Sequence, residues 1–232
     1  MSESVQVWQI SLEVSEETLQ AYENCLSVDE RSRADRFHFL ADRRRFIVSR
    51  GTLRHLLSRQ FGRSPKDIEF CYGEYGKPSI VLDSESHCNF HFNVSHSGEL
   101  ALCALGGQAR VGVDIEKLKP IQRLDSMMER CLSKIELDQV NNEPEPTHAF
   151  LQRWTCKEAY LKAIGLGLSQ SMQTVEVEIT PFKLVSVPKD CADGWQLHPI
   201  EVPEGYVSAL VTEGNNSVTF DRWQHELLSK DD

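Results

Sequence analysis

The stretch Val111-Gly112-Val113-Asp114-Ile115-Glu116 alternates apolar residues with small or acidic ones, which is the pattern of a β-strand with one buried face. In such a strand the apolar side chains point to a core, and Asp114 and Glu116 share the opposite face about 6–7 Å apart. The glycine beside them leaves room for an approaching ligand, so the two acids are a candidate binding site for a hard cation such as Mg²⁺. Taken alone, such a hexapeptide is more commonly an ordinary half-solvated strand, and the surrounding sequence has to decide.

The composition is that of a soluble globular protein, with 40% hydrophobic and 26% charged residues among 232, enough for one large domain or two small ones. The N-terminus has neither a basic start nor an apolar run, and no stretch has the roughly 18–20 apolar residues of a membrane span. The seven cysteines are scattered, without a C-x-x-C pair. We therefore expect reduced thiols in a cytoplasmic protein that has no membrane partner.

The net charge of −10 hides one basic segment. Between Asp29 and Lys66, eleven Lys and Arg residues stand against only four acids, a local net charge of +7. One basic helical patch in an acidic protein indicates a local anionic ligand rather than a nucleic-acid partner. A solvated helix face would account for the same charges equally well.

Cap residues and apolar spacing divide the chain into helical and extended segments. Predicted helices begin at Ser15, Ser27, Asp42, Ser133 and Pro146, and Ser27 opens a capping box with Glu30. The helix that runs from residue 146 to Gly165 is expected to be the longest amphipathic one. Predicted strands cover residues 5–14, 67–72, 90–94, 100–105 and 111–116, and the chain after residue 174 is mostly β.

A faint internal repeat suggests two similar halves. Glycines, apolar residues and an aspartate recur at a constant offset of 107 residues: Gly98, Gly107, Val111, Val113 and Asp114 correspond to Gly205, Gly214, Val218, Phe220 and Asp221. We expect an α+β fold of two similar α/β subdomains, residues 1–110 and 111–232, related by pseudo-twofold symmetry. Each would be a small, mostly antiparallel sheet with packed helices.

The stretch Trp154-Thr155-Cys156-Lys157-Glu158-Ala159-Tyr160-Leu161-Lys162 carries a second set of charges. Glu158 and Lys162 are four residues apart, so they share a helix face close to the apolar stripe of that helix. If the helix lies across the strand 111–116, Glu158 becomes a third oxygen donor beside Asp114 and Glu116, which suits Mg²⁺. A solvated Glu–Lys surface pair is the simpler interpretation.

The third stretch, Asn93-Val94-Ser95-His96-Ser97, lies at the end of a predicted strand. A histidine between two hydroxyls can act as a general base, bind phosphate or ligate a metal, although a lone histidine is more often structural. A Ser–His–acid hydrolase is one rival. The G-x-S-x-G turn that would expose its nucleophile is absent from the sequence.

In the order Gly76-Lys77-Pro78, then 93–97, 112–116 and 154–162, these motifs resemble those of the 4′-phosphopantetheinyl transferases of the surfactin-synthetase type. The resemblance covers residues 27 to about 169. It implies transfer of 4′-phosphopantetheine from coenzyme A to a serine of an apo acyl or peptidyl carrier protein, with release of 3′,5′-ADP. Mg²⁺ would be the cofactor, with Mn²⁺ left open, and the carrier could serve fatty-acid, polyketide or peptide synthesis.

The resemblance also implies roles for individual residues. Asp114, Glu116 and Glu158 would bind the metal, and Glu158 would take the serine proton. Lys162 would neutralise phosphate charge during transfer, with Lys157 as a second candidate.

Other residues would bind the cofactor. The loop Gly76-Lys77-Pro78 would border the adenine, and Asn93 belongs to the same cofactor-binding set. Ser95, His96 and one arginine, Arg45 or Arg33, would hold the 3′-phosphate, which would give the basic segment a use.

A non-catalytic module that binds coenzyme A or a nucleotide is the alternative from another class, since it would need none of the three acids. A metal-dependent phosphodiesterase on the same carboxylates is a third interpretation. The length and the two similar halves indicate a monomer with a cleft between its own halves. A candidate docking groove for the carrier protein consists of Met127, Met128, Leu132, Ile135 and Leu137, with internal packing as an equal alternative.

Overall fold

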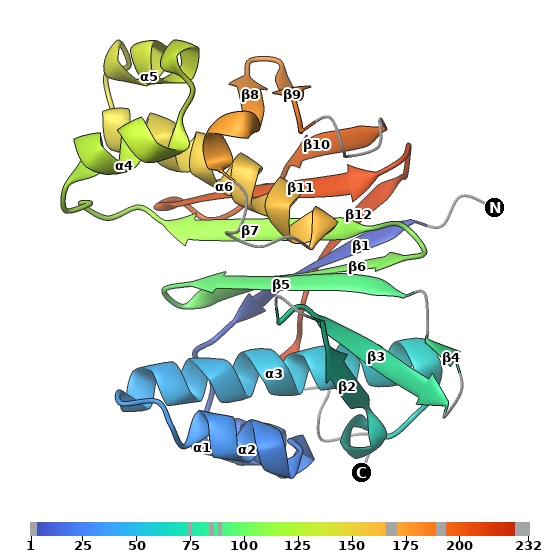
Figure 1. The fold of residues 1–232 in the computed structure, drawn as a ribbon. Helices are drawn as coiled ribbons and strands as arrows, with labels where there is room; N and C mark the ends of the chain where they lie inside the picture. Colours follow the sequence, from blue (N-terminus) through green and yellow to red (C-terminus); the bar gives the residue numbers. More distant parts are fainter. Residues whose placement is uncertain are drawn as a thin grey trace.

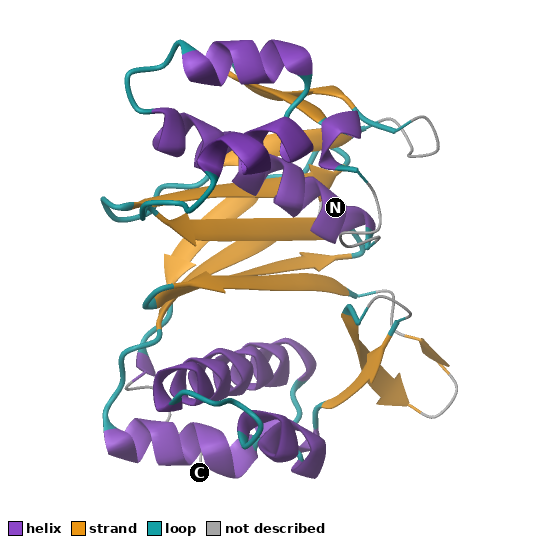
Figure 2. Cartoon of the chain, turned by 60° about the vertical axis from the view of Figure 1, so that its left-hand side comes forward, coloured by secondary structure: helices purple, strands orange, loops and turns teal. Residues whose placement is uncertain are grey.

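The computed structural model describes residues 4–73, 76–83, 86–87, 90–165, 171–188 and 194–225. Helices enclose a central region of strands from two sides (Figures 1 and 2). On one side lie α1 (Glu16–Cys25), α2 (Val28–Ala34) and α3 (Leu40–Phe61), and on the other lie α4 (Leu124–Cys131), α5 (Lys134–Asn141) and α6 (Pro146–Ile164). Single 3₁₀ turns are η1 (Pro65–Asp67) and η3 (Met172–Thr174).

Two sheets form the centre. The first has the order β12-β1-β6-β5 and contains β1 (Val5–Ser11), β5 (His91–Ser97), β6 (Leu100–Gly107) and β12 (Val218–Arg222). Only the β1–β12 pair is parallel among the described pairs of this sheet. The second sheet is antiparallel, has the order β10-β11-β7, and contains β7 (Val111–Lys117), β10 (Trp195–Pro199) and β11 (Tyr206–Glu213).

Two smaller antiparallel sheets complete the described strands. One has the order β2-β3-β4 and consists of β2 (Glu69–Tyr72), β3 (Pro78–Asp83) and β4 (Ser86–His87). The other is the hairpin of β8 (Glu176–Ile179) and β9 (Phe182–Ser186). The expected mixture of helices with small, mostly antiparallel sheets is therefore confirmed.

The two central sheets meet along β5 and β7, which are edge strands lying side by side (Figure 1). Side chains of β5 join the strands: Asn93 Oδ1 accepts from the Val113 N–H at 2.9 Å, and Ser97 Oγ accepts from the Lys117 N–H at 3.1 Å. Alternating side chains of β5 thus bind the backbone of β7 where the two sheets meet, in place of a ladder of backbone hydrogen bonds.

Strand β7 is buried on both faces, which the sequence pattern did not predict. Val111, Val113 and Ile115 are fully buried as expected, but Asp114 on the opposite face is only 3% exposed. Helix α6 covers this face because Gly112 lets its backbone come close: a Cβ on Gly112 would lie 2.0 Å from the Ala159 carbonyl oxygen.

The helix boundaries confirm the predicted caps at Ser15, Ser27 and Ser133, and both Ser27 and Ser133 form complete capping boxes. The prediction for the longest helix was wrong, because α3 has 22 residues and α6 has 19. The buried face of α3 also includes a basic residue, since Arg54 is 2% exposed and its Nε donates to Glu30 at 2.7 Å.

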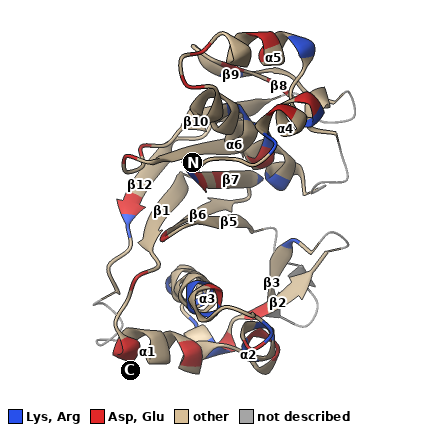
Figure 3. Ribbon diagram, turned by 90° about the vertical axis from the view of Figure 1, so that its left-hand side faces the viewer, with Lys and Arg blue, Asp and Glu red and all other residues tan. Residues whose placement is uncertain are grey.

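Acids from elsewhere in the chain neutralise much of the basic segment, as the mixed charges of α1 to α3 in Figure 3 show. Glu23 pairs with Arg43, Glu16 with Arg44 and Glu99 with Arg45, and all three acids lie outside the basic segment. The local charge of +7 is therefore not all available to a ligand. Within the described residues, every helix is too short or too polar to cross a lipid bilayer.

Candidate active site

An open pocket of about 360 Å³ lies where β5, β7 and α6 meet. Six of its lining residues were predicted as site residues from the sequence, namely Ser95, His96, Asp114, Glu116, Glu158 and Lys162. Val94 and Trp154 complete the lining. The fold thus brings three of the sequence motifs, which lie up to 67 residues apart, to one place.

Strand and helix geometry place the charged groups. Asp114 and Glu116 alternate along β7, and Trp154, Glu158 and Lys162 follow one another at intervals of four on α6. Because Gly112 brings α6 against β7, the two sets of side chains reach the same pocket.

Lys162 connects the helix to both strands. Its Nζ donates to Asp114 Oδ1 at 2.6 Å and to Ser95 Oγ at 2.9 Å, and Ser95 Oγ donates to the same Asp114 oxygen at 2.7 Å. Asp114 Oδ1 is therefore fully used by protein donors. Ser95 therefore orients the Asp114 carboxylate by this hydrogen bond, in addition to lining the pocket.

The second oxygens of the acids have no such partners. Asp114 Oδ2 and Glu158 Oε1 are buried, and neither has a hydrogen-bond partner in the described part of the chain. A buried carboxylate oxygen without a partner is costly, and a bound cation would satisfy it. In the described ranges, no three His, Cys, Asp or Glu side chains already enclose a metal position, and Lys162 is the cation next to Asp114. The donor chemistry fits a hard cation, because every donor is an oxygen.

Burial changes the proton affinity of two acids in the pocket. Burial first, and next the charge of Asp114, raise the pKa of Glu158 above its usual value, against the opposing effect of Lys162. Burial is also the main cause that raises the pKa of Glu116, although a hydrogen bond from Ser97 at 2.7 Å opposes it. A carboxylate with a raised pKa is a better proton acceptor near neutral pH.

Two residues of the pocket region were missed by the sequence interpretation. Ser97 binds Glu116, and the alternation of Asn93, Ser95 and Ser97 on one face of a strand was the available signal. Trp154 lines the pocket four residues before Glu158, which was the corresponding helical signal.

The expected cofactor-binding loop reaches α6 through Lys77. Its Nζ donates to the carbonyl oxygens of Lys162 at 2.6 Å and Ala163 at 3.1 Å, at the C-terminal end of α6. Burial, and next the charge of Arg110, lower the pKa of Lys77 to about 8. Gly76 has a φ of +75°, and Pro78 begins β3. Lys77 therefore stabilises the end of the helix that carries Glu158.

The candidates for anion binding divide into two groups. His96 is exposed and lines the pocket. Arg45 forms an ion pair with Glu99, which lies in the turn that follows β5. Arg33 instead lines a different pocket with Tyr72, and its guanidinium lies 5.3 Å from the centre of the Phe46 ring. Asn93 is used in the seam between the sheets.

Lys157 does not reach the pocket, contrary to the expectation that it is a second phosphate ligand. It is fully buried, and its Nζ donates to Glu136 Oε2 at 2.6 Å and to two backbone carbonyls. Neighbouring residues of a helix point about 100° apart, so Lys157 and Glu158 serve different faces of α6. The proposed docking groove is also largely interior, since Met128 and Leu132 are each 2% exposed, while Ile135 is 65% exposed.

Two family models match successive parts of the chain. The model of a family described as 4′-phosphopantetheinyl transferase superfamily matches residues 110–211, and that of a family described as 4′-phosphopantetheinyl transferase, N-terminal, matches residues 10–107. The crystal structure of holo-[acyl-carrier-protein] synthase from Thermotoga maritima has a TM-score of 0.39 at 24% identity and covers 46% of this chain and 63% of that one.

Similarity to two bacterial proteins extends over most of the sequence. The 4′-phosphopantetheinyl transferase HetI of Nostoc sp. is 36% identical over 216 residues, which cover 92% of this chain and 90% of HetI. The 4′-phosphopantetheinyl transferase Sfp of Bacillus subtilis is 32% identical over 200 residues, covering 85% of this chain and 86% of Sfp. On these grounds the chain belongs to the 4′-phosphopantetheinyl transferase superfamily.

Proposed function

We propose that this enzyme transfers 4′-phosphopantetheine from coenzyme A to a serine of an apo acyl or peptidyl carrier protein. The serine Oγ forms a bond to the phosphorus next to pantetheine, the bond from that phosphorus to the bridging oxygen breaks, and 3′,5′-ADP leaves with that oxygen. The convergence of Asp114, Glu116, Glu158 and Lys162 in one pocket carries this proposal. Phosphoryl transfer asks a protein mainly for positioning and charge neutralisation, and these residues supply both.

In this reaction Glu158 accepts the serine proton. Its raised pKa and its position on the pocket wall support this role. Lys162 neutralises the charge that develops on the phosphates, which its partial exposure of 26% permits. Asp114, through its bond to Lys162, holds that ammonium group at the pocket before substrate binds.

Asp114, Glu116 and Glu158 would also hold a magnesium ion. When bound, the ion would supply positive charge to the pyrophosphate of coenzyme A. The two buried carboxylate oxygens without partners support this assignment.

Residues at the edges of the pocket would bind the nucleotide part of coenzyme A. Ser95, His96 and Arg45 are the candidates for the 3′-phosphate, because the first two lie in β5 and Arg45 of α3 pairs with Glu99 in the turn that follows β5. The loop around Lys77 would border the adenine. Arg33 is a weaker candidate, since it lines another pocket.

The two halves, residues 1–110 and 111–232, are proposed to be subdomains related by a pseudo-twofold axis. The order of elements supports this, because β1, helices, a small antiparallel sheet, β5 and β6 are followed by β7, helices, a second small antiparallel sheet, β10 and β11. In each half the last of these strands lies between the other two, as β1-β6-β5 and as β7-β11-β10. The two similar halves would form the cleft within one chain, which supports a monomer, and the free cysteines among the described residues support a cytoplasmic location.

The test is an intact-mass measurement. The protein is incubated with coenzyme A, Mg²⁺ and apo carrier proteins from fatty-acid, polyketide and peptide synthesis, and each carrier is then weighed. A mass gain of one phosphopantetheine is expected, and a carrier whose acceptor serine is replaced by alanine should show none. Binding of coenzyme A without a mass gain on any carrier would overturn the proposal in favour of a non-catalytic binding module.

A second measurement tests the metal assignment. Asp114→Ala should weaken the binding of coenzyme A in the presence of Mg²⁺ while leaving the weaker metal-free binding nearly unchanged, as followed by calorimetric titration. Identical titration curves for the variant and the wild type would contradict the role of Asp114.

A further inference from the structure

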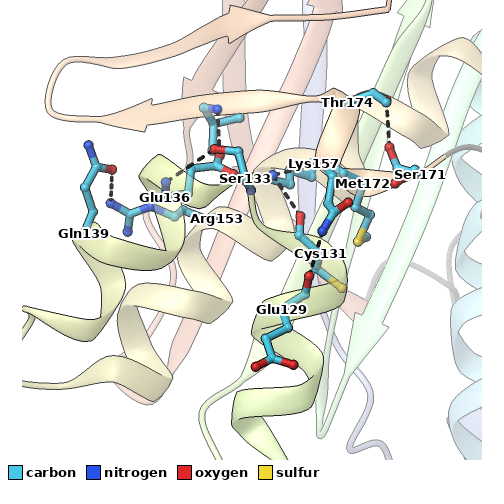
Figure 4. A network of polar contacts seen from close by, with 12 residues as sticks. Glu129, Cys131, Ser133, Glu136, Gln139, Arg153, Lys157, Ser171, Met172 and Thr174 are labelled. Carbon is cyan, nitrogen blue, oxygen red and sulfur yellow. Dashed lines mark hydrogen bonds and ion pairs between the residues drawn. The ribbon is translucent and has the colours of Figure 1, made fainter.

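A second ion pair on α6 lies away from the pocket, between Lys157 and Glu136 of α5 (Figure 4). Lys157 is 0% exposed and Glu136 is 3% exposed, so both charges are inside the protein. Burying two charges is unfavourable unless their remaining hydrogen-bonding groups also find partners. The surroundings of this pair meet that condition.

Both residues have their bonding groups filled by the protein. The three donors of Lys157 Nζ go to Glu136 Oε2 at 2.6 Å, the Cys131 carbonyl at 2.9 Å and the Met172 carbonyl at 3.1 Å. Glu136 Oε2 also accepts from the Ser133 N–H at 2.8 Å, and Glu136 Oε1 accepts from the Val177 N–H at 3.0 Å. No donor of Lys157 is left for a substrate.

The bonds connect α6 to four other elements. The Cys131 carbonyl is at the end of α4, Glu136 is in the first turn of α5, Met172 is in η3, and Val177 is in β8. Lys157 thus joins α6 to α4, α5 and η3 directly and to β8 through Glu136. A shift of any one of these elements would break a buried hydrogen bond.

The position of Lys157 in the sequence connects its buried hydrogen bonds to the pocket. Lys157 directly precedes Glu158, and Lys162 lies a little more than one turn further along the same helix. A rotation of α6 about its axis would move Glu158 and Lys162 away from Asp114, but it would also pull Lys157 out of its buried site. A buried ion pair is well suited to fix the rotational position of a helix.

We propose that Lys157 is a positioning residue for the transfer reaction: its buried bonds to Glu136 and to the two carbonyls fix the rotation of α6, and thereby hold Glu158 and Lys162 in the pocket. This inference rests on the proposed function, because it concerns the orientation of the groups assigned to it. It assigns Lys157 no contact with coenzyme A.

The experiment compares three variants with the wild type. Lys157→Met removes one charge and leaves Glu136 buried without its cation, so we expect that variant to lose stability and to give a low yield. The double variant Lys157→Met/Glu136→Gln removes both charges at similar volume and should melt at a higher temperature than Lys157→Met, because no unpaired charge stays buried. Arg153→Met is the matched control, since Arg153 is also a buried cation of α6, and its hydrogen bonds within the described residues go to Ala149 of its own helix and to Gln139.

The decisive quantity is the split between kcat and KM in the double variant. A loss of positioning should lower kcat by about 10- to 100-fold, because small misplacements of reacting groups have effects of that size. The KM for coenzyme A should stay within about threefold, since Lys157 makes no contact with it. Arg153→Met should keep the kcat of the wild type even where its melting temperature falls.

The outcomes that overturn the inference are distinct. A wild-type kcat in the double variant would show that the pair only stabilises the fold. An increase in KM as large as the decrease in kcat would show that Lys157 binds the cofactor instead. Absence of transfer by the wild-type enzyme on every carrier would contradict the proposed function itself, which is a different result from either.

Discussion

Helix α6 carries two lysine–carboxylate pairs of the same length in different surroundings. The Nζ–O distance is 2.6 Å both for Lys157–Glu136 and for Lys162–Asp114, but Lys157 is 0% exposed and Lys162 is 26% exposed. In the inner pair both oxygens of Glu136 have partners, whereas Asp114 Oδ2 in the pocket has none in the described structure. The difference shows that an ion pair is identified as part of a site by its unused bonding groups, not by its length.

The same difference appears in the charges nearby. The pocket pair lies next to Glu116 and Glu158, so it carries an excess of negative charge, and the pKa of Glu158 is raised by burial and by Asp114. The inner pair has one charge of each sign and two carbonyls that complete it. One face of α6 therefore uses its lysine for rigidity, and the face at the pocket keeps an incomplete charge set that a cation and a phosphate can complete.

The largest effect is expected for Glu158→Gln. The variant keeps the size of the side chain but removes the proton acceptor, and general acid–base catalysis typically contributes about 10²- to 10⁴-fold. We expect kcat to fall within that range, measured by the mass of the carrier over time, while calorimetry gives a coenzyme A affinity within a few-fold of the wild type. Wild-type turnover in this variant would show that another group takes the proton.

The next effect is expected for Lys162→Met, which removes the cation of the pocket pair. Loss of one group that stabilises charge in the transition state costs about 10²- to 10³-fold in kcat. Coenzyme A binding should also weaken here, unlike in the double variant of the inner pair, because Lys162 faces the pocket. If both lysine sites gave the same change in kcat and KM, the contrast between the two pairs would not hold.

A smaller effect is expected for Gly112→Ala, which acts on the helix that carries both pairs. The new Cβ would lie 2.0 Å from the Ala159 carbonyl oxygen and 2.4 Å from the Ala163 nitrogen, so the backbone of α6 would have to move. Overpacking of this kind typically costs about 1–3 kcal/mol, which urea unfolding can measure. The pocket pair should suffer more than the inner pair, because only the pocket pair links α6 to β7. An alanine variant with wild-type stability and wild-type kcat would show that α6 does not depend on the close approach at Gly112.

The sequence was sufficient to predict which acidic residues share a face, where the serine-capped helices begin and where the central strands lie, because these features follow from local rules. Alternation placed Asp114 and Glu116 on one face, and a spacing of four placed Glu158 and Lys162 on one face. The order of the motifs then pointed to the correct family, which the comparisons confirm.

The long-range partners could not be predicted from local patterns. Lys157 and Glu136 are 21 residues apart, and a lysine in a charged motif gives no local sign that it points inward. The same holds for Arg54, which occupies a core position of α3 where Glu30 of α2 and the Pro65 and Ile68 carbonyls accept its hydrogen bonds. A charged residue at a buried position is therefore the reason why the role of Lys157 was predicted wrongly.

The smallest effect is expected at a third pair, Arg110–Glu213, which lies where β7 begins and β11 ends. It is bidentate, with Nε–Oε2 at 2.8 Å and Nη2–Oε1 at 2.7 Å, but each side chain is 35% exposed. Exposed pairs are screened by water, so Glu213→Gln should cost only about 0.2–1 kcal/mol at pH 7 in urea unfolding. The inner pair, in contrast, should not tolerate removal of one partner.

The pH dependence of this third pair follows from its pKa. The hydrogen bonds from Arg110 lower the pKa of Glu213 below its ordinary value of 4.5, so the folded state binds the Glu213 proton less tightly than the unfolded state does. The stabilisation is therefore present above pH 4.5 and is lost as the pH falls through the lowered pKa of the folded protein. The stability difference between wild type and Glu213→Gln should accordingly shrink in acid, whereas a difference that stayed constant from pH 7 to acid would assign it to packing rather than to charge.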